Sequence, residues 1–222
     1  MSNRLRLIAL PVLVAATTAC LPDVALETDV QKASYSIGRD IGTSLVDYEE
    51  HLDMMALFMG VTDALSEMES KVTDEEIEAA MTAFNEMVQA AAGERAANEG
   101  AAYLEENAAR EGVMITASGL QYEVLREGDG ESPVSGQRVT VHYRGTLPDG
   151  SEFDSSHSRG EPSSFRVDGV IDGFSEALKL MKVGGQIRVV IPSDLAYGAE
   201  GQAPRIGPNQ VLVFEIELLG VE

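Results

Sequence analysis

One short stretch of the chain gathers side chains that could do acid–base or nucleophilic chemistry. The segment GSEFDSSHSRGEP, residues 150–162, holds Asp154, His157, Arg159 and four serines. A serine hydrolase needs its nucleophile, base and orienting carboxylate in one hydrogen-bonded line, and neighbouring residues of one loop seldom reach that geometry. We therefore predict that this segment is not a catalytic triad, and its role has to follow from the elements around it.

The N-terminus has the layout of a bacterial export signal. A short basic start precedes an apolar run from Leu7 to Ala16, which is too short to remain as a membrane span. Small residues then lead to Cys20, and because it is the only cysteine no intramolecular disulfide can form. The segment resembles a lipobox, which implies a signal peptide over residues 1–19, cleavage before Cys20 and lipidation of that cysteine. Thr17 departs from the usual aliphatic residue, so an ordinary signal peptide cleaved nearby is the alternative.

Charge and motifs exclude several classes of protein. The formal net charge is -21, from 37 acidic and 16 basic residues, so we expect no nucleic-acid partner, which would need a surplus of Lys and Arg. The sequence has no Cys/His cluster, no GxxxxGK[ST] loop and no GxSxG elbow. We therefore expect neither a metal nor a cofactor.

Composition divides the mature chain into two parts. Residues 24–112 are rich in Ala, Glu and Met, whereas residues 113–222 turn to Gly, Pro, Val and Ile in alternating runs. We expect the first part to be a helical dimerisation domain with a linking helix. Its methionines favour helix packing or dimerisation over a flexible surface for unfolded chains, because methionine fills cores readily.

Helical signals recur through the first part. Residues 73–88, TDEEIEAAMTAFNEMV, open with Thr and Glu at capping-box spacing and continue with apolar residues at helical spacing. Residues 52–68 and 33–46 predict two earlier helices. Residues 89–112 form helices readily but carry few large apolar side chains, so they predict a solvated helix that bridges two domains and stops at Gly112.

Alternating patterns in the second part predict strands. Residues 137–145 (QRVTVHYRG) and 211–219 (VLVFEIELL) alternate apolar and polar side chains, and residues 120–127 and 186–192 behave similarly. Residues 171–181, IDGFSEALKLM, predict a single short helix. The expected fold class is therefore α+β, with a twisted antiparallel sheet wrapped on one short helix after the N-terminal helices.

Three blocks of the second part resemble a known family. Residues 139–156, 170–198 and 206–219 look like FKBP-type peptidyl-prolyl cis/trans isomerases, in the same order and at nearly the same spacing. The helical part, with SYSIG and the SGLQYEVLREGDG entry to the sheet, is similar to the macrophage infectivity potentiator group of bacterial envelope isomerases.

The resemblance implies an activity, a location and partners. It implies a homodimer through the N-terminal helices and a periplasmic isomerase that assists the folding of exported, proline-containing polypeptides. A lipid anchor to the outer membrane would be its one membrane contact. Macrolides such as rapamycin would be inhibitors.

The resemblance also implies the residues of an apolar pocket. Alone, the strand pattern would make most of them core residues. The catalytic set would be Tyr143, Phe153, Asp154 and Tyr197, and the substrate-binding set Arg159, Val170, Ile171, Phe174, Ile206 and Phe214. Phe174 would lie beneath the proline ring, Tyr197 would offer its hydroxyl to a substrate carbonyl, and Asp154 would be an ionised carboxylate held by Arg159 and tyrosine hydroxyls.

Rotation about an X-Pro bond needs no proton transfer, so the histidine and serines of residues 150–162 are expected to be loop residues. The sequence departs from the family at Phe174, where tryptophan is usual, at Ser163 or Ser164 in place of a rim aromatic, and at Arg205 in an apolar segment. Two alternatives remain: a holdase-type periplasmic chaperone with weak isomerase activity, and a purely structural lipoprotein.

Overall fold

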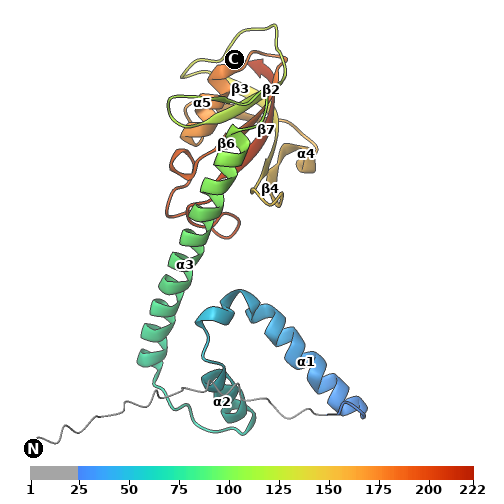
Figure 1. Ribbon diagram of the computed structural model, residues 1–222, viewed down its shortest axis with the longest axis vertical. Helices are drawn as coiled ribbons and strands as arrows, with labels where there is room; N and C mark the ends of the chain where they lie inside the picture. The colour runs from blue at the N-terminus through green and yellow to red at the C-terminus, as the bar shows by residue number, and fades with distance from the viewer. Residues whose placement is uncertain (1–24) are drawn as a thin grey trace, which may run out of the picture. The chain divides into compact units, whose positions relative to one another are not determined.

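The computed structural model describes residues 25–222, and the chain divides into two units, Met1–Leu52 and Asp53–Glu222. In the first unit, helix α1 (Asp29–Leu45) is followed by the short 3-10 helix η1 (Val46–His51) (Figure 1). The sequence predicted this helix, which begins earlier than expected. The reason is a capping box at Thr28, whose hydroxyl accepts a hydrogen bond from the first turn.

The second unit opens with two helices, α2 (Met54–Leu65) and α3 (Asp74–Ala108). Asp53 caps α2 by accepting two backbone N–H bonds, so the helix begins at Met54, and it ends at the C-cap Ser66, within the predicted range of residues 52–68. The capping box predicted at the start of α3 is present. The Thr73 hydroxyl accepts from the backbone of Glu76, whose carboxylate accepts in return.

The C-terminal half of α3 is not a solvated bridge, and this corrects the expectation for residues 89–112. Gly93, Ala96, Gly100 and Asn107 are buried. These small residues let the helix approach the sheet, since a Cβ on Gly100 would lie 2.7 Å from Cγ2 of Val211. Residues 89–112 therefore lack large side chains because the helix lies close to the sheet domain.

A small apolar cluster lies in the seam between α3 and the sheet. Its buried members are three valines of the sheet and its preceding loop, and two α3 side chains pack against them: Val190, Val211, Val213, Tyr103 and Leu104. The seam continues toward the N-terminus of α3, where the Asn209 side-chain amide donates to the Gly93 carbonyl at 3.2 Å. The second half of α3 is thus packed as part of the sheet domain.

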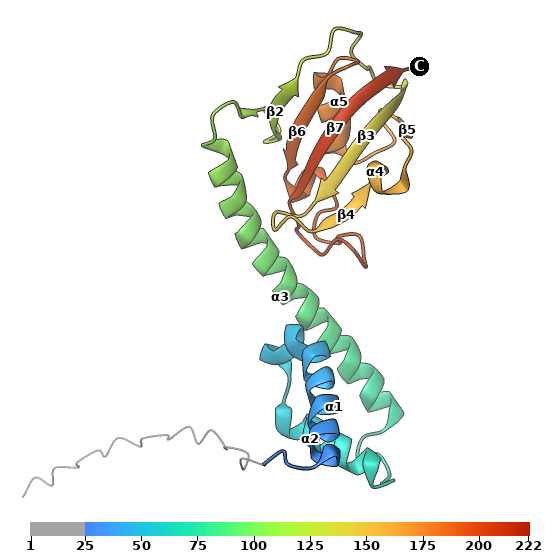
Figure 2. The same ribbon diagram turned by 90° about the vertical axis from the view of Figure 1, so that its right-hand side faces the viewer.

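The rest of the second unit is one antiparallel sheet with the strand order β1-β2-β6-β7-β3-β4, and β5 pairs with the other half of the β3 edge (Figure 2). The strands are β1 (Met114–Ile115), β2 (Gln121–Arg126), β3 (Arg138–Thr146), β4 (Glu152–Ser155), β5 (Ser163–Arg166), β6 (Gln186–Ile191) and β7 (Leu212–Val221). The shorter helices are α4 (Ser156–Arg159), α5 (Asp172–Leu180) and η2 (Ser193–Leu195).

Helix α5 lies across one face of this sheet and closes the core (Figure 2). The alternation predicted for β3 and β7 is confirmed, because the apolar member of each pair points inward. The core side chains of these two strands are Val139, Val141, Tyr143, Leu212, Phe214, Ile216 and Leu218. Phe174 and Leu178 meet them from α5. The α+β class is therefore confirmed.

Among residues 25–222, none of the helices combines the length and apolar character needed to cross a bilayer.

Candidate active site

A cavity of about 530 Å³ opens between α5 and the inner face of the sheet. Its lining is dominated by aromatic rings from β3, β4, β5, α5, β7 and the segment after η2: Tyr143, Phe153, Phe165, Phe174, Tyr197 and Phe214. The Phe174 and Phe214 rings meet edge to face, with centroids 5.1 Å apart. Phe153 meets Phe214 in the same way at 5.4 Å. Such contacts fix the rings relative to one another and make a stiff apolar surface.

A glycine in β3 makes room for two of these rings. A Cβ on Gly145 would lie 2.6 Å from Phe153 and 2.8 Å from Phe214. No side chain fits at those distances, so glycine is required where the rings cross the strand.

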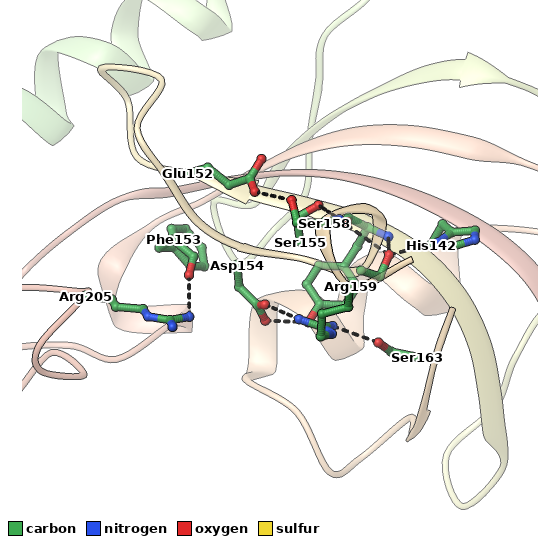
Figure 3. Close-up of polar contacts among 11 residues, drawn as sticks. His142, Glu152, Phe153, Asp154, Ser155, Ser158, Arg159, Ser163 and Arg205 are labelled. Carbon is green, nitrogen blue, oxygen red and sulfur yellow. Dashed lines mark hydrogen bonds and ion pairs between the residues drawn. The ribbon is translucent and has the colours of Figure 1, made fainter. Parts of the chain in front are cut away.

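One corner of the cavity is polar. The Asp154 carboxylate accepts hydrogen bonds from the Tyr143 hydroxyl and the Arg159 guanidinium (Figure 3). The second terminal nitrogen of Arg159 donates to the Tyr143 hydroxyl and to the Ser163 hydroxyl, both at 2.9 Å. The carboxylate is thereby paired with a cation and a hydroxyl group of the protein.

These contacts set the ionisation of the corner. Partial burial disfavours the charged carboxylate, but the hydrogen bonds from Tyr143 and Arg159 outweigh it, so the pKa of Asp154 lies below its ordinary value. Burial, followed by the hydrogen bond to Asp154, raises the pKa of Tyr143. Asp154 is therefore ionised and Tyr143 neutral at physiological pH.

Tyr197 differs from Tyr143 in having its hydroxyl available. Burial and then the charge of Asp154 raise the pKa of Tyr197, so the hydroxyl keeps its proton. Tyr197 lines the cavity, and within residues 25–222 its hydroxyl neither donates nor accepts a hydrogen bond. It is a neutral donor that a ligand can reach.

The segment after Asp154 positions Arg159. Ser155 caps the short helix α4, and Gly160, with φ of 78°, ends it. Ser156 is fully buried, and its hydroxyl accepts the backbone N–H of Tyr143 at 2.8 Å. A loop was predicted here, but the segment forms a helical turn, because the Ser155 hydroxyl accepts the backbone N–H of Ser158 and the Ser156 hydroxyl ties the turn to β3.

His157 takes no part in a triad. Its ring stacks on His142, with centroids 4.5 Å apart. Among the described contacts, none joins His157 to a serine or to Asp154. The polar residues of segment 150–162 thus form the part of the cavity wall that holds Arg159, and the described contacts among them form no charge-relay arrangement.

The structure brings nearly all of the expected site residues to one place. Those that line the aromatic cavity are Tyr143, Phe153, Asp154, Val170, Ile171, Phe174, Tyr197, Ile206 and Phe214. Arg159 lines an adjoining cavity and contacts Asp154. Cys20 lies outside the described residues.

Phe165 is a rim residue that was not predicted. The family resemblance placed a rim aromatic at position 163 or 164, where this chain has serine, but Phe165 supplies a ring to the cavity. Ser163 and Phe165 are half-buried while their neighbours are exposed, as the alternation of β5 requires. That alternation, read in the letters SSFR, was the signal available.

The loop before Ile206 also lines the cavity, through Arg205, which the resemblance had marked as a departure, and through three residues that no pattern placed there: Gln202, Ala203 and Pro204. No group of three or more His, Cys, Asp or Glu side chains that could hold a metal ion occurs in the described part of the chain.

Comparison with protein families matches both parts of the chain. The family model described as FKBP-type peptidyl-prolyl cis-trans isomerase matches residues 129–219. A second, described as the domain amino terminal to FKBP-type peptidyl-prolyl isomerase, matches residues 30–124. The two models together span the helices and the sheet.

Individual proteins are similar over most of their length. The FKBP-type peptidyl-prolyl cis-trans isomerase FkpA of Escherichia coli K12 is 44% identical over 219 residues, which cover 92% of this chain and 80% of FkpA. The outer membrane protein MIP of Legionella longbeachae is 36% identical and covers 97% of this chain and 94% of its own. The crystal structure of FkpA from Escherichia coli matches with a TM-score of 0.67 at 43% identity, over 89% of this chain and 99% of that one. The chain therefore belongs to the FKBP-type peptidyl-prolyl cis-trans isomerases.

Proposed function

We propose that the aromatic cavity is the catalytic centre at which this isomerase rotates X-Pro bonds of exported polypeptides, without covalent, cofactor or metal chemistry. The observation that supports this most is the cavity itself. It is lined by edge-packed rings, its one carboxylate is already paired with Arg159, and Tyr197 offers a free neutral hydroxyl. The alternative of a holdase-type chaperone is not favoured, because the relatives are named as isomerases.

Such a cavity suits the chemistry of prolyl rotation. The barrier of about 18–20 kcal/mol comes from amide resonance, which is lost when the C–N bond twists. The twisted amide is less polar than the planar one, so a water-poor apolar surface disfavours the planar ground state relative to it. Binding energy that favours the twisted form lowers the barrier, and no group has to give or take a proton.

Three roles follow for the lining residues. The buried ring of Phe174, at the centre of the edge-packed set, is the floor for the proline ring. The Tyr197 hydroxyl donates to a substrate carbonyl and holds the chain while the bond turns. Asp154 fixes Tyr143 and Arg159 in the cavity wall.

The test is a cis/trans assay on short X-Pro peptides with an apolar residue before the proline. We expect the wild-type protein to accelerate isomerisation, and Tyr197→Phe to lower kcat/KM about three- to tenfold, the worth of one hydrogen bond. Asp154→Leu should lower it several-fold, because Tyr143 and Arg159 lose their shared acceptor. Tyr35→Phe is the matched control, since Tyr35 is an exposed residue of α1.

The proposal fails if the folded wild-type protein gives no acceleration above the spontaneous rate. Equal activity of Tyr197→Phe, Asp154→Leu and the control would show instead that the assigned residues are wrong. Rapamycin should inhibit the wild-type protein by filling the same cavity, and the assay is repeated in its presence.

The location and assembly are part of the same proposal. We infer a periplasmic homodimer anchored to the outer membrane through a lipid on Cys20, after cleavage of residues 1–19. Support comes from the apolar run before Cys20, from the name of the outer membrane relative, and from the apolar residues that the helices leave exposed. The most exposed are Val30, Met55 and Leu65, at 75%, 75% and 82%.

Mass spectrometry of the exported protein would find a lipid on Cys20, whereas an unmodified thiol would refute the anchor. Light scattering behind size-exclusion chromatography would report twice the chain mass. A monomer at micromolar concentration would refute the dimer.

A further inference from the structure

A second cavity of about 650 Å³ adjoins the aromatic one. The two share Phe153, Asp154 and Arg205, which form the border between them. The second cavity is lined mainly by polar side chains, including Glu152, Ser158 and Arg159. A polypeptide that leaves the aromatic cavity across this border therefore comes within reach of the charged side chains that line the second cavity.

In the described part of the chain, one hydrogen bond of the Arg205 side chain holds it at the border. Its Nη1 donates to the main-chain carbonyl oxygen of Phe153 at 3.0 Å (Figure 3). The side chain crosses from the loop before Ile206 to strand β4, and Arg205 is exposed. A guanidinium carries five N–H donors, so this contact leaves the others available to a ligand.

The charges around Arg205 are otherwise balanced. Asp154 pairs with Arg159, and Glu152 pairs with Arg144 at 2.8 Å and accepts from the Ser158 hydroxyl. Arg205 forms no ion pair with any residue in the described part of the chain. The border thus carries one cation that the protein leaves uncompensated.

We propose that Arg205 forms a subsite for an acidic side chain of the substrate, close in sequence to the isomerised proline. A carboxylate is the group whose two oxygens match the guanidinium fork. An extended chain advances about 3.3 Å per residue, and Arg205 lines the same cavity as Phe174, so we place the acidic side chain within two residues of the proline. The inference rests on the proposed function, because it assumes that the proline binds in the aromatic cavity.

The negative net charge of the protein does not abolish the preference of Arg205 for an acidic side chain. The net charge of -21 repels an acidic peptide at long range, but salt screens exposed charges over about 8 Å at physiological ionic strength. A contact between Arg205 and a carboxylate acts inside that distance. We expect this contact to raise kcat/KM a few-fold, as an exposed ion pair would.

The experiment uses the full-length protein and matched peptides with one proline. A glutamate is placed in turn at the two positions before and the two after the proline, and each peptide is compared with its glutamine counterpart. The quantity measured is the Glu/Gln ratio of kcat/KM. For the wild-type protein we expect a ratio of about three or more at one position at least, falling toward one in high salt.

Variants separate the local cation from the overall charge. Arg205→Gln should bring the ratio to about one, Arg205→Lys should keep part of it, and Arg205→Glu should favour lysine peptides instead. The matched control is Arg126→Gln, which makes the same change in net charge. Arg126 pairs with Glu217 and lines neither cavity.

The outcomes distinguish this inference from the proposed function. If the glutamine peptides are not accelerated at all, the catalytic proposal fails. If they are accelerated but the Glu/Gln ratio is the same in wild type and Arg205→Gln at every position, the subsite is refuted. A wild-type ratio that does not fall with salt refutes it without any variant.

Discussion

Replacing Asn107 with alanine tests whether the second half of α3 is an integral part of the sheet domain. Asn107 is 3% exposed, at the seam between α3 and the sheet. Its Nδ2 donates to Gln121 Oε1 at 2.8 Å, and its Oδ1 accepts from Arg188 at 2.8 Å and Arg110 at 2.9 Å. Alanine removes one donor and one acceptor from a buried position.

The expected cost follows from what each partner retains. Gln121 is 5% exposed and its oxygen loses a buried donor, which costs about 1–3 kcal/mol. Arg188 keeps the Tyr103 hydroxyl and Arg110 keeps Glu123, so their losses add about 1 kcal/mol together. The higher helix propensity of alanine adds about 0.6 kcal/mol to the free energy of unfolding. The net loss in the free energy of unfolding is about 2 kcal/mol.

Urea unfolding followed by far-UV circular dichroism measures this loss at fixed protein concentration. The matched control is Asn98→Ala, an exposed position of the same helix that should gain about 0.6 kcal/mol. The two variants should differ by about 2.5 kcal/mol. Equal urea midpoints for Asn107→Ala and Asn98→Ala would refute the reasoning, because the seam would then contribute nothing to folding.

Two further predictions concern the cavity. Gly145→Ala should destabilise the fold by about 1–3 kcal/mol and lower kcat/KM, because its Cβ would overlap Phe153 and Phe214; unchanged thermal unfolding and activity would contradict this. The pH profile of kcat/KM should be flat from about pH 5 to 9, because the pKa of Asp154 is lowered and those of Tyr143 and Tyr197 are raised. An activity step of the wild-type protein near pH 7 would contradict the assignment. The contribution of ionised Asp154 to stability is present above its unfolded pKa and is lost as the pH falls through its lower folded pKa.

Local patterns predicted most of the sheet. Val139, Val141 and Tyr143 alternate with polar neighbours along β3, and burial on one face of a sheet is enough to fix which side points inward. The capping box of α3 was predicted for the same reason, since Thr73 and Glu76 interact only with the turn they begin. Each of these signals depends on a few consecutive residues.

The contacts of α3 with the sheet could not be predicted in this way. Glycine and alanine carry no apolar signal, and their role at Gly93 and Gly100 depends on residues far along the chain, such as Val211. The cavity posed the same difficulty. Phe174 and Phe214 follow strand and helix patterns that any core residue would follow, so only the family resemblance assigned them to a site. A domain boundary near residue 112, drawn from composition, remains a prediction, and the contacts of the α3 seam cross it.

The polar corner of the cavity is consistent with catalysis that moves no proton. Tyr143 comes from β3, Asp154 from β4, Arg159 from α4 and Ser163 from β5, and their hydrogen bonds join these four elements. The two charged groups of this set, Asp154 and Arg159, pair with each other, so the corner supplies no free nucleophile or base. We infer that it holds the Tyr143 ring, and with it the Phe174 and Phe214 rings that Tyr143 contacts, at a fixed separation. An ion pair at the rim therefore keeps the apolar surface rigid without making its interior polar.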